Sequence, residues 1–432
     1  MSSIAGSAAP TSATTSTNAS SASSSTSPPA TLVSSKRDDW TTISVVAMAH
    51  GVSHFYQLSL VSLFPWVQTQ FGLSFTQLGF ALTVFYIVSG FGQSAAGFVV
   101  DNLGARRVLL ISLALAAAAA IGMSASPSFL WICVFAGVAG LANCPFHPID
   151  FSILNARVSK DRLPIAYSIH SVCGNLGWAV APLFTVSIAH YWGWRVALAA
   201  AGIVGVLTLL TVLLNWKMLD DSALQRRANA QNNSNPQADQ SLLGFLRLPT
   251  VWWSFLYFAV LAAALSGFQS FGAESSRKLH DLPLAYVTAF LTVYSLAGAA
   301  GMLIGGAFTK VDSQFDRIIG VTFAIAAAIA FVMALVKIEP LLFMVLLGAI
   351  GAITGFAQTS RDLLIRKVAP PNATGRVYGF VYSGLDAGTA FAPLVFGGML
   401  DANAPIGVWL AIAILQIILV AIAWRMGRMT NS

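Results

Sequence analysis

Charged side chains are scarce in this sequence: Asp, Glu, Lys and Arg make up 9% of its 432 residues, whereas soluble domains carry about 25%. Because 56% of the residues are hydrophobic, a soluble fold would lack polar side chains to cover its surface. Apolar windows of about 20 residues recur along the chain, and each is long enough to cross the hydrocarbon core of a bilayer. The composition therefore excludes an ordinary soluble protein and predicts an all-α membrane protein.

Cysteine is also scarce. Cys133, Cys144 and Cys173 lie in apolar segments without CxxC spacing, which indicates packing rather than metal or redox chemistry. The sequence contains no GxSxG, HExxH or GxxxxGK motif and its loops are short, so we expect neither an enzyme nor a resident cofactor or metal. The net charge of +7 comes from basic residues in short connections, which set membrane topology and do not indicate a nucleic-acid surface.

The apolar segments predict twelve transmembrane helices in two groups of six. We expect a disordered Ser/Thr-rich cytoplasmic tail at 1–39, a six-helix bundle at 40–216, a polar cytoplasmic linker at 217–249, a second six-helix bundle at 250–425 and a short cytoplasmic tail at 426–432.

Basic residues predict the orientation. The loops expected outside carry only Arg195, Arg277, Lys278 and Lys337, while nearly all other Lys and Arg residues lie on the opposite side. The positive-inside rule then places both termini in the cytoplasm of a multi-pass protein of the bacterial plasma membrane.

The two halves resemble each other at a constant separation. Gly90 corresponds to Gly301, Asp101 to Asp312, Arg106 to Arg317, Asn175 to Asp386 and Gly177 to Gly388. This regularity favours a duplicated unit, so that the two bundles would be pseudo-symmetric, a plan that many transporters use.

Polar side chains concentrate in the first of every three expected spans. They are His50, His54 and Gln57 in 41–66; Asn143, His147 and Asp150 in 128–153; Gln269 in 250–274; and Gln358, Arg361 and Asp362 in 340–366. His170, Asn175 and Asp386 lie in the fifth and eleventh spans. Ionisable residues within membranes usually face a water-filled cavity and pair with one another. We therefore expect these helices to line a shared cavity that binds substrate or protons, with Asp150 facing away from lipid.

Several of these residues have a second interpretation. His50 and His54 could simply bond neighbouring carbonyl groups, and Asp150 could form a structural pair with a buried cation instead of binding a proton or substrate. Arg361 suits either an anion or a structural ion pair. Asp386, among small residues, suits packing or gating as well as substrate contact.

Residues 97–107, GFVVDNLGARR, resemble the signature loop of the major facilitator superfamily. The matching positions are Gly97, Asp101, Gly104, Arg106 and Arg107. The resemblance implies a cytoplasmic gating loop, in which Gly104 permits a tight turn and Asp101 with the arginines links helix ends. A second copy at 305–317 keeps Asp312 and Arg317 but lacks the turn glycine.

The segments FHPIDFSILNARVS and SIHSVCGNLGWAVAP are similar to the fosmidomycin-resistance branch of that superfamily, at Phe146, His147, Pro148, Gly174, Asn175 and Gly177. This resemblance implies proton-coupled efflux of a drug or organic anion by alternating access, with the proton gradient as driving force and a monomer as the working unit. Proton-coupled uptake of an organic acid or another small metabolite is the alternative. A sensor built on a transporter fold is a third reading.

Overall fold

The computed structural model describes residues 36–220, 244–308, 314–368 and 374–431, and every regular element within these ranges is helical. The expected linker at 217–249 and tail at 1–39 therefore lie largely outside the described residues. The first half contains α1 (Lys36–Ser59), η1 (Val61–Leu63), α2 (Phe64–Phe71), α3 (Phe75–Leu103), α4 (Ala105–Ser124), α5 (Phe129–Asn143), α6 (Phe146–Arg157), η2 (Lys160–Arg162), α7 (Leu163–Trp192), α8 (Trp194–Leu214) and η3 (Trp216–Leu219). The second half contains η5 (Gly244–Arg247), α10 (Pro249–Ser266), η6 (Gly267–Gly272), α11 (Ala273–His280), α12 (Leu284–Phe308), α13 (Phe315–Leu335), α14 (Pro340–Val368), α15 (Thr374–Asp401) and α16 (Pro405–Asn431).

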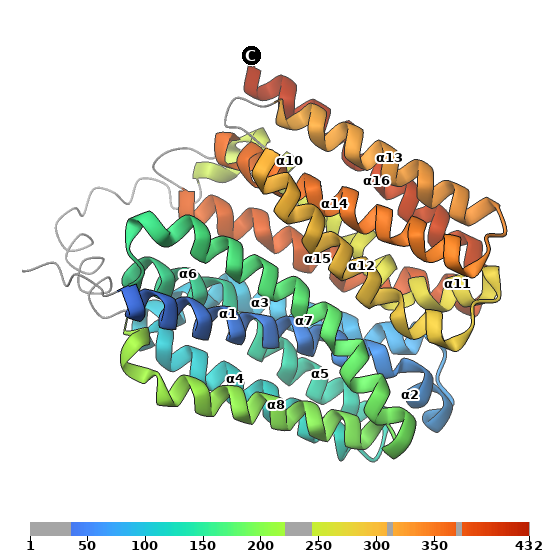
Figure 1. Ribbon diagram of the computed structural model, residues 1–432, viewed down its shortest axis with the longest axis horizontal. Coiled ribbons are helices and arrows are strands. Elements are labelled where there is room, and N and C mark those ends of the chain that lie inside the picture. Colours follow the sequence, from blue (N-terminus) through green and yellow to red (C-terminus); the bar gives the residue numbers. More distant parts are fainter. Residues whose placement is uncertain (1–35, 221–243, 309–313, 369–373, 432) are drawn as a thin grey trace, which may run out of the picture. The chain divides into compact units, whose positions relative to one another are not determined.

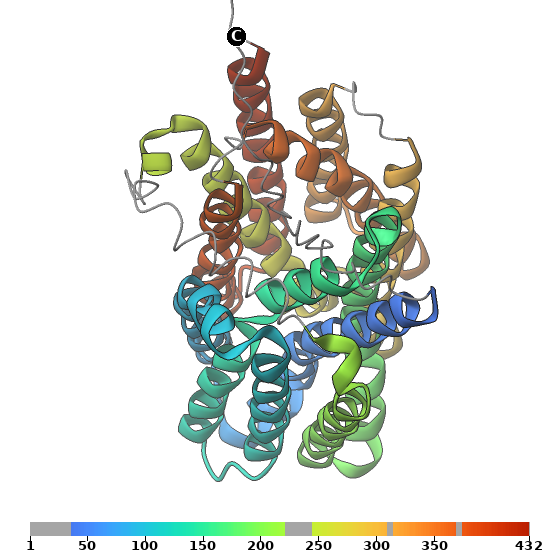
Figure 2. The same cartoon turned by 90° about the vertical axis from the view of Figure 1, so that its left-hand side faces the viewer.

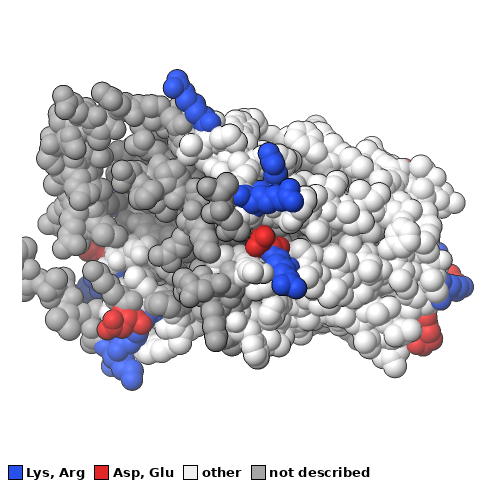
Figure 3. Space-filling model, turned by 90° about the horizontal axis from the view of Figure 1, so that it is seen from above, with Lys and Arg blue, Asp and Glu red and all other residues white. Residues whose placement is uncertain are grey.

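Within the described residues, ten helical segments are long and apolar enough to cross a membrane. The two remaining expected spans correspond to α1 and α15, which carry His50, His54 and Asp386 among their apolar residues. Figure 3 shows a broad zone free of charged side chains between those at its right-hand end and those nearer its middle. Such a zone is what a membrane-spanning surface requires, because a charge at the bilayer centre is costly.

Helix packing in the second half repeats that in the first. The contacts of α1 with α7 and of α4 with α8 correspond to those of α10 with α15 and of α13 with α16. Likewise, α3 packs on α5 as α12 packs on α14. The fold thus consists of two pseudo-symmetric groups of helices, as the sequence predicts.

The halves meet along two helix pairs, α3 with α15 and α7 with α12 (Figures 1 and 2). Hydrogen bonds cross both pairs: the Thr83 hydroxyl donates to the carbonyl of Ala390 at 2.6 Å, and the Thr292 hydroxyl donates to that of Ala179 at 2.8 Å. On α3, a Cβ added at Gly79 would collide with the carbonyl of Pro393. Small residues therefore let the two backbones approach closely.

At one end of the interface between the halves, hydrogen bonds to a carboxylate join the two halves. Asp401, at the end of α15, accepts hydrogen bonds from the backbone N–H groups of Phe75 and Thr76, at 2.7 and 2.9 Å, and from the Thr76 hydroxyl at 2.6 Å. We call this the closed end. There both halves share one hydrophobic core, in which the ring of Phe271 packs against those of Phe64 and Phe75.

At the opposite end, where α1 begins and α16 ends, each half has a core of its own. Ile43, Leu109 and Ile153 belong to the core of the first half, and Phe258 and Phe323 to that of the second. We call this the terminal end. The halves are thus joined at one end and separately packed at the other.

Three expected spans differ in detail. Pro145, which cannot donate a backbone hydrogen bond, separates α5 from α6 within the expected span 128–153. The seventh span runs to His280 rather than residue 274 and contains the π-helical segment η6, which holds Gln269. The first span ends at Ser59, before η1 and α2.

The helices also extend into expected tails. α1 begins at Lys36 rather than at residue 40, and Asp39 is fully buried because its carboxylate binds the Ser159 hydroxyl at 2.7 Å and the Arg162 guanidinium at 2.5 Å. At the other terminus, α16 continues through Asn431 into the expected tail 426–432.

Candidate functional site: a buried histidine–aspartate cluster

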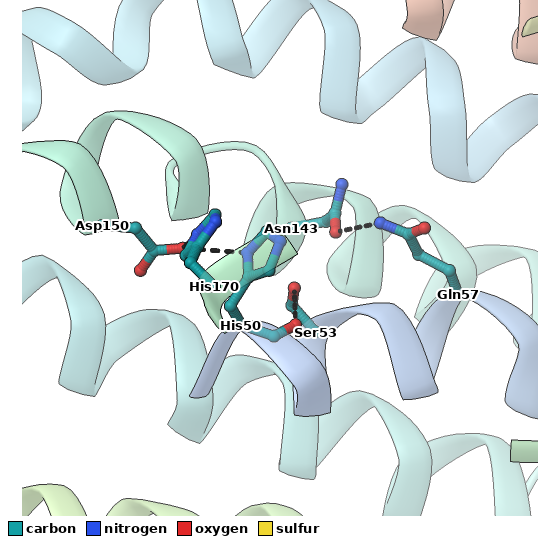
Figure 4. A network of polar contacts seen from close by, with 6 residues as sticks. All are labelled: His50, Ser53, Gln57, Asn143, Asp150 and His170. Carbon is teal, nitrogen blue, oxygen red and sulfur yellow. Dashed lines mark hydrogen bonds and ion pairs between the residues drawn. The ribbon is translucent and has the colours of Figure 1, made fainter. Parts of the chain in front are cut away.

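Three helices of the first half bring two histidines onto one carboxylate. Nδ1 of His50 on α1 and Nε2 of His170 on α7 each lie 2.9 Å from Oδ2 of Asp150 on α6 (Figure 4). Asp150 is fully buried, and both imidazole side chains are 4% exposed. Asp150 thus does not face lipid, and its two partners are polar side chains in the interior of α1 and α7.

Two more histidines complete the group, which we call the histidine cluster: His50, His54, His147, His170 and Asp150. The rings of His50 and His170 stack with centroids 3.6 Å apart, while His54 and His147 lie 4.5 and 5.4 Å from His50. Close contact between four imidazoles disfavours charging all of them together, because like charges repel strongly in a medium of low dielectric constant.

Within the described part of the chain, two atoms of the cluster are buried without a hydrogen-bond partner: Oδ1 of Asp150 and Nδ1 of His54. A buried carboxylate is tolerated only when a cation or several donors compensate its charge. A proton shared among Asp150, His50 and His170 would provide that compensation. The cluster can therefore hold a variable number of protons, and its unpartnered oxygen can accept one more hydrogen bond.

The same three residues offer ligand atoms that all lie within 4.8 Å of one another. In a tetrahedral zinc site with bonds of 2.0–2.1 Å, neighbouring donor atoms are about 3.3 Å apart. The observed spacing of 2.9 Å between each imidazole nitrogen and Oδ2 is that of a hydrogen bond. The geometry thus fits a proton-sharing cluster better than a metal site. The fold nevertheless brings together three side chains of metal-ligating type, which the sequence spacing did not predict.

A second polar group connects α1, α3, α5 and α7. Trp178 Nε1 donates to Oε1 of Gln57 at 2.9 Å, Gln57 Nε2 donates to Oδ1 of Asn143 at 3.0 Å, and Asn143 Nδ2 donates to the hydroxyl of Ser89 at 3.0 Å. Figure 4 shows the Gln57–Asn143 bond beside the histidine cluster. The Ser89 hydroxyl in turn interacts with the carboxyl group of Asp386 on α15. This group, which we call the amide chain, crosses from one half to the other.

The remaining expected residues are not among the hydrogen-bond partners described for the histidine cluster. Asn175 donates to the carbonyl of Ser171 on its own helix at 3.1 Å. Gln269 lies in the π-helical segment, and its Nε2 is buried without a partner among the residues that the structure describes. Gln358 and Arg361 lie on α14 in the second half, where the Arg361 guanidinium sits 5.1 Å from the Phe258 ring centroid. The side chain of Asp362 lies outside the described residues.

The family model of the Major Facilitator Superfamily matches residues 46–393 of the chain. The chain belongs to this superfamily. It is a multi-pass membrane protein and a secondary transporter of small molecules rather than an enzyme.

Among curated relatives of this transporter, the uncharacterised MFS-type transporter YfnC of Bacillus subtilis is 25% identical over 87% of the chain and 90% of YfnC. The fosmidomycin resistance protein of Escherichia coli is 24% identical over 84% of the chain and 86% of the relative. The crystal structure of the nucleoside transporter NupG shares the fold, with a TM-score of 0.69 and 14% identity over 89% of the chain and 99% of NupG.

The signature loop of this facilitator forms the tight turn between α3 and α4. Gly104 has a φ of 89°, a conformation that suits glycine. Arg106 contacts the segment after α8: its guanidinium lies 4.1 Å from the Trp216 ring centroid and 3.8 Å from the carboxylate of Asp220. The expected link through Asp101 cannot be compared, because the side chains of Asp101 and of positions 97 and 98 lie outside the described residues, and Arg107 is exposed.

Sequence reasoning overlooked Ser89 and the role of Trp178. Ser89 is fully buried between Asn143 and Asp386, and Trp178 stacks on His54 with centroids 4.4 Å apart. A serine directly before Gly90 in an apolar helix is a weak signal. Trp178 gives no stronger signal, because aromatic residues in apolar helices more often serve packing.

Proposed function

We propose that this transporter exports a small drug or organic anion in exchange for protons, and that the histidine cluster is its proton site. The observation that carries the proposal is the fully buried Asp150 carboxylate, which two imidazoles share while its second oxygen has no partner among the described side chains. Such a group can gain or lose a proton at little structural cost, because its three sites are already in hydrogen-bond contact and can redistribute the remaining charge without moving apart.

The arrangement of the two halves supports alternating access. They share a core and the Asp401 bonds at the closed end and are separately packed at the terminal end. With both termini in the cytoplasm, this state corresponds to one closed towards the outside. The name of the Escherichia coli relative supports a drug as the exported molecule.

Transport in proteoliposomes tests the proposal. Vesicles with an acidic lumen should accumulate fosmidomycin from outside, because protons leaving the lumen drive exchange whichever way the protein is inserted. Asp150→Asn preserves the size and one acceptor of the side chain but cannot ionise, so it should abolish gradient-driven accumulation while gradient-free exchange persists. Asp281→Asn, which alters an exposed carboxylate in the loop before α12, is the matched control and should behave as the unsubstituted protein.

Two results would contradict the proposal. Accumulation that ignores the pH gradient would exclude proton coupling, and full gradient-driven accumulation by Asp150→Asn would remove the cluster as the proton site. Accumulation only under the opposite gradient, with an organic acid as the substrate, would replace export by proton-coupled uptake.

A further inference from the structure

The amide chain has a direction that its hydrogen-bond donors impose. Each link, from Trp178 through Gln57 and Asn143 to Ser89, donates towards Asp386. Because Ser89 accepts a hydrogen bond from Asn143, its own hydroxyl hydrogen is free to point at the Asp386 carboxyl group. Aligned donors polarise one another, so a chain of this kind is stronger than its separate bonds.

The last link lies at the contact between the halves. Ser89 is fully buried and Asp386 is 9% exposed. A Cβ added at Gly90 would lie only 2.9 Å from the Cβ of Asp386, so α3 and α15 touch at this point. Among the described residues, Tyr86 on α3 and Cys144 after α5 are titratable side chains that interact with Asp386. Any movement that separates α3 from α15 at this point must separate Ser89 from Asp386.

The first link lies against the histidine cluster. The indole of Trp178 both donates to Gln57 and stacks on His54, and His54 packs on His50. His50 donates to or accepts from Asp150 through Nδ1. A change in the cluster that shifts these stacked rings therefore moves the donor that begins the amide chain.

We propose that Ser89 is a positioning residue that couples the histidine cluster to the packing of α3 on α15, by way of the amide chain and Asp386. The two ends are buried carboxyl groups in different halves, and a continuous series of contacts joins them. Breaking the chain leaves both groups intact but makes the separation of the halves independent of the state of the cluster. This inference rests on the proposed function of the cluster.

A double-mutant cycle tests the coupling. Spin labels at Leu103 and Trp252, exposed positions near the terminal end of α3 and α10, report the separation of the halves in a background with Cys133, Cys144 and Cys173 replaced by alanine. In the otherwise unsubstituted protein, Asp150→Asn should change the ratio of short to long distances by about fivefold or more, the lower end of typical coupling between sites. In a Ser89→Ala background the same substitution should change that ratio little.

Thr83→Val is the matched control, because it removes another hydrogen bond between α3 and α15 that does not belong to the amide chain. It should shift the resting ratio yet leave the response to Asp150→Asn intact. If the response survives equally in Ser89→Ala and Thr83→Val, the coupling through Ser89 is refuted while the proton site stands. If Asp150→Asn changes neither distances nor gradient-driven transport in any background, the proposed function fails as well.

Discussion

In the first half, α1, α6 and α7 enclose four imidazoles and a carboxylate, whereas among the described side chains the corresponding helices of the second half, α10, α14 and α15, bring together Phe258, Ala357 and Val381, with the Arg361 guanidinium over the Phe258 ring. Yet the helices pack in the same pairs in both halves. Duplication thus accounts for the scaffold, while the histidine cluster lies in one copy. The second half contributes groups at the contact surface, Asp386 and Asp401.

The largest difference between the halves should appear when each loses its buried carboxylate. Asp150→Ala leaves two buried imidazoles without their shared partner and should lower the free energy of unfolding by about 3–5 kcal/mol. Asp386→Ala breaks one hydrogen bond from Ser89 and should cost about 1–3 kcal/mol. Denaturation in mixed detergent micelles measures both. Equal losses of unfolding free energy would mean that the two carboxylates have equivalent environments, and would contradict the difference between the halves.

Alanine substitutions at the corresponding glycines Gly177 and Gly388 should lower the free energy of unfolding by similar amounts. A Cβ at Gly177 would collide with the carbonyl of Gly51, and one at Gly388 would collide with the carbonyl of Ala259. Each substitution overpacks an equivalent helix contact and should lower the free energy of unfolding by about 1–3 kcal/mol. The same denaturation assay applies, and a loss confined to one glycine would argue against equivalent packing.

A smaller effect is expected where the halves meet at the closed end. Asp401→Ala removes the acceptor for two N–H groups at the start of α3 and should cost the closed end about 0.5–2 kcal/mol, whereas Asp401→Asn keeps an acceptor. Spin labels at the exposed positions Thr69 and Ala402 should show more separation in the alanine variant than in the asparagine variant. Identical distance distributions for both variants and the unsubstituted protein would show that Asp401 does not hold this end.

The smallest effect belongs to an exposed pair. Lys337 donates to Asp281 at 2.6 Å and holds the pKa of Asp281 below its ordinary value. Any stabilisation is therefore present above the ordinary pKa of an aspartate and is lost as the pH falls through the lowered value in the folded protein. Both side chains are largely exposed, so Asp281→Asn should leave the thermal unfolding midpoint unchanged near neutral pH. A marked drop there would assign this loop a role that the geometry does not indicate.

Much of the fold follows from one-dimensional patterns. The apolar windows, the matching glycines of the two halves and the GFVVDNLGARR loop predict twelve helices in two related groups, because bilayer thickness fixes helix length and close helix packing requires small residues. Exact helix ends do not follow in this way. The break at Pro145 and the π-helical segment at Gly267–Gly272 depend on what packs around them.

The sequence predicts only part of the candidate site. His50 and His54 share a helical face, as do Asn143, His147 and Asp150, so their mid-membrane position and their facing towards protein are determined by the chain itself. The third partner, His170, comes from α7, and Ser89 and Asp386 meet only because α3 of one half packs on α15 of the other. Arg361, which looked equally polar in sequence, lies instead over Phe258 in the second half.

The sequence by itself determined that this protein crosses the membrane many times and must enclose its few ionisable groups, since hydrocarbon tolerates neither bare charge nor unpaired polar atoms. Tertiary structure decided which of those groups share a proton and which connect the halves. Hydrogen bonds act over about 3 Å, and residues far apart in the chain reach that distance only when whole helices pack together.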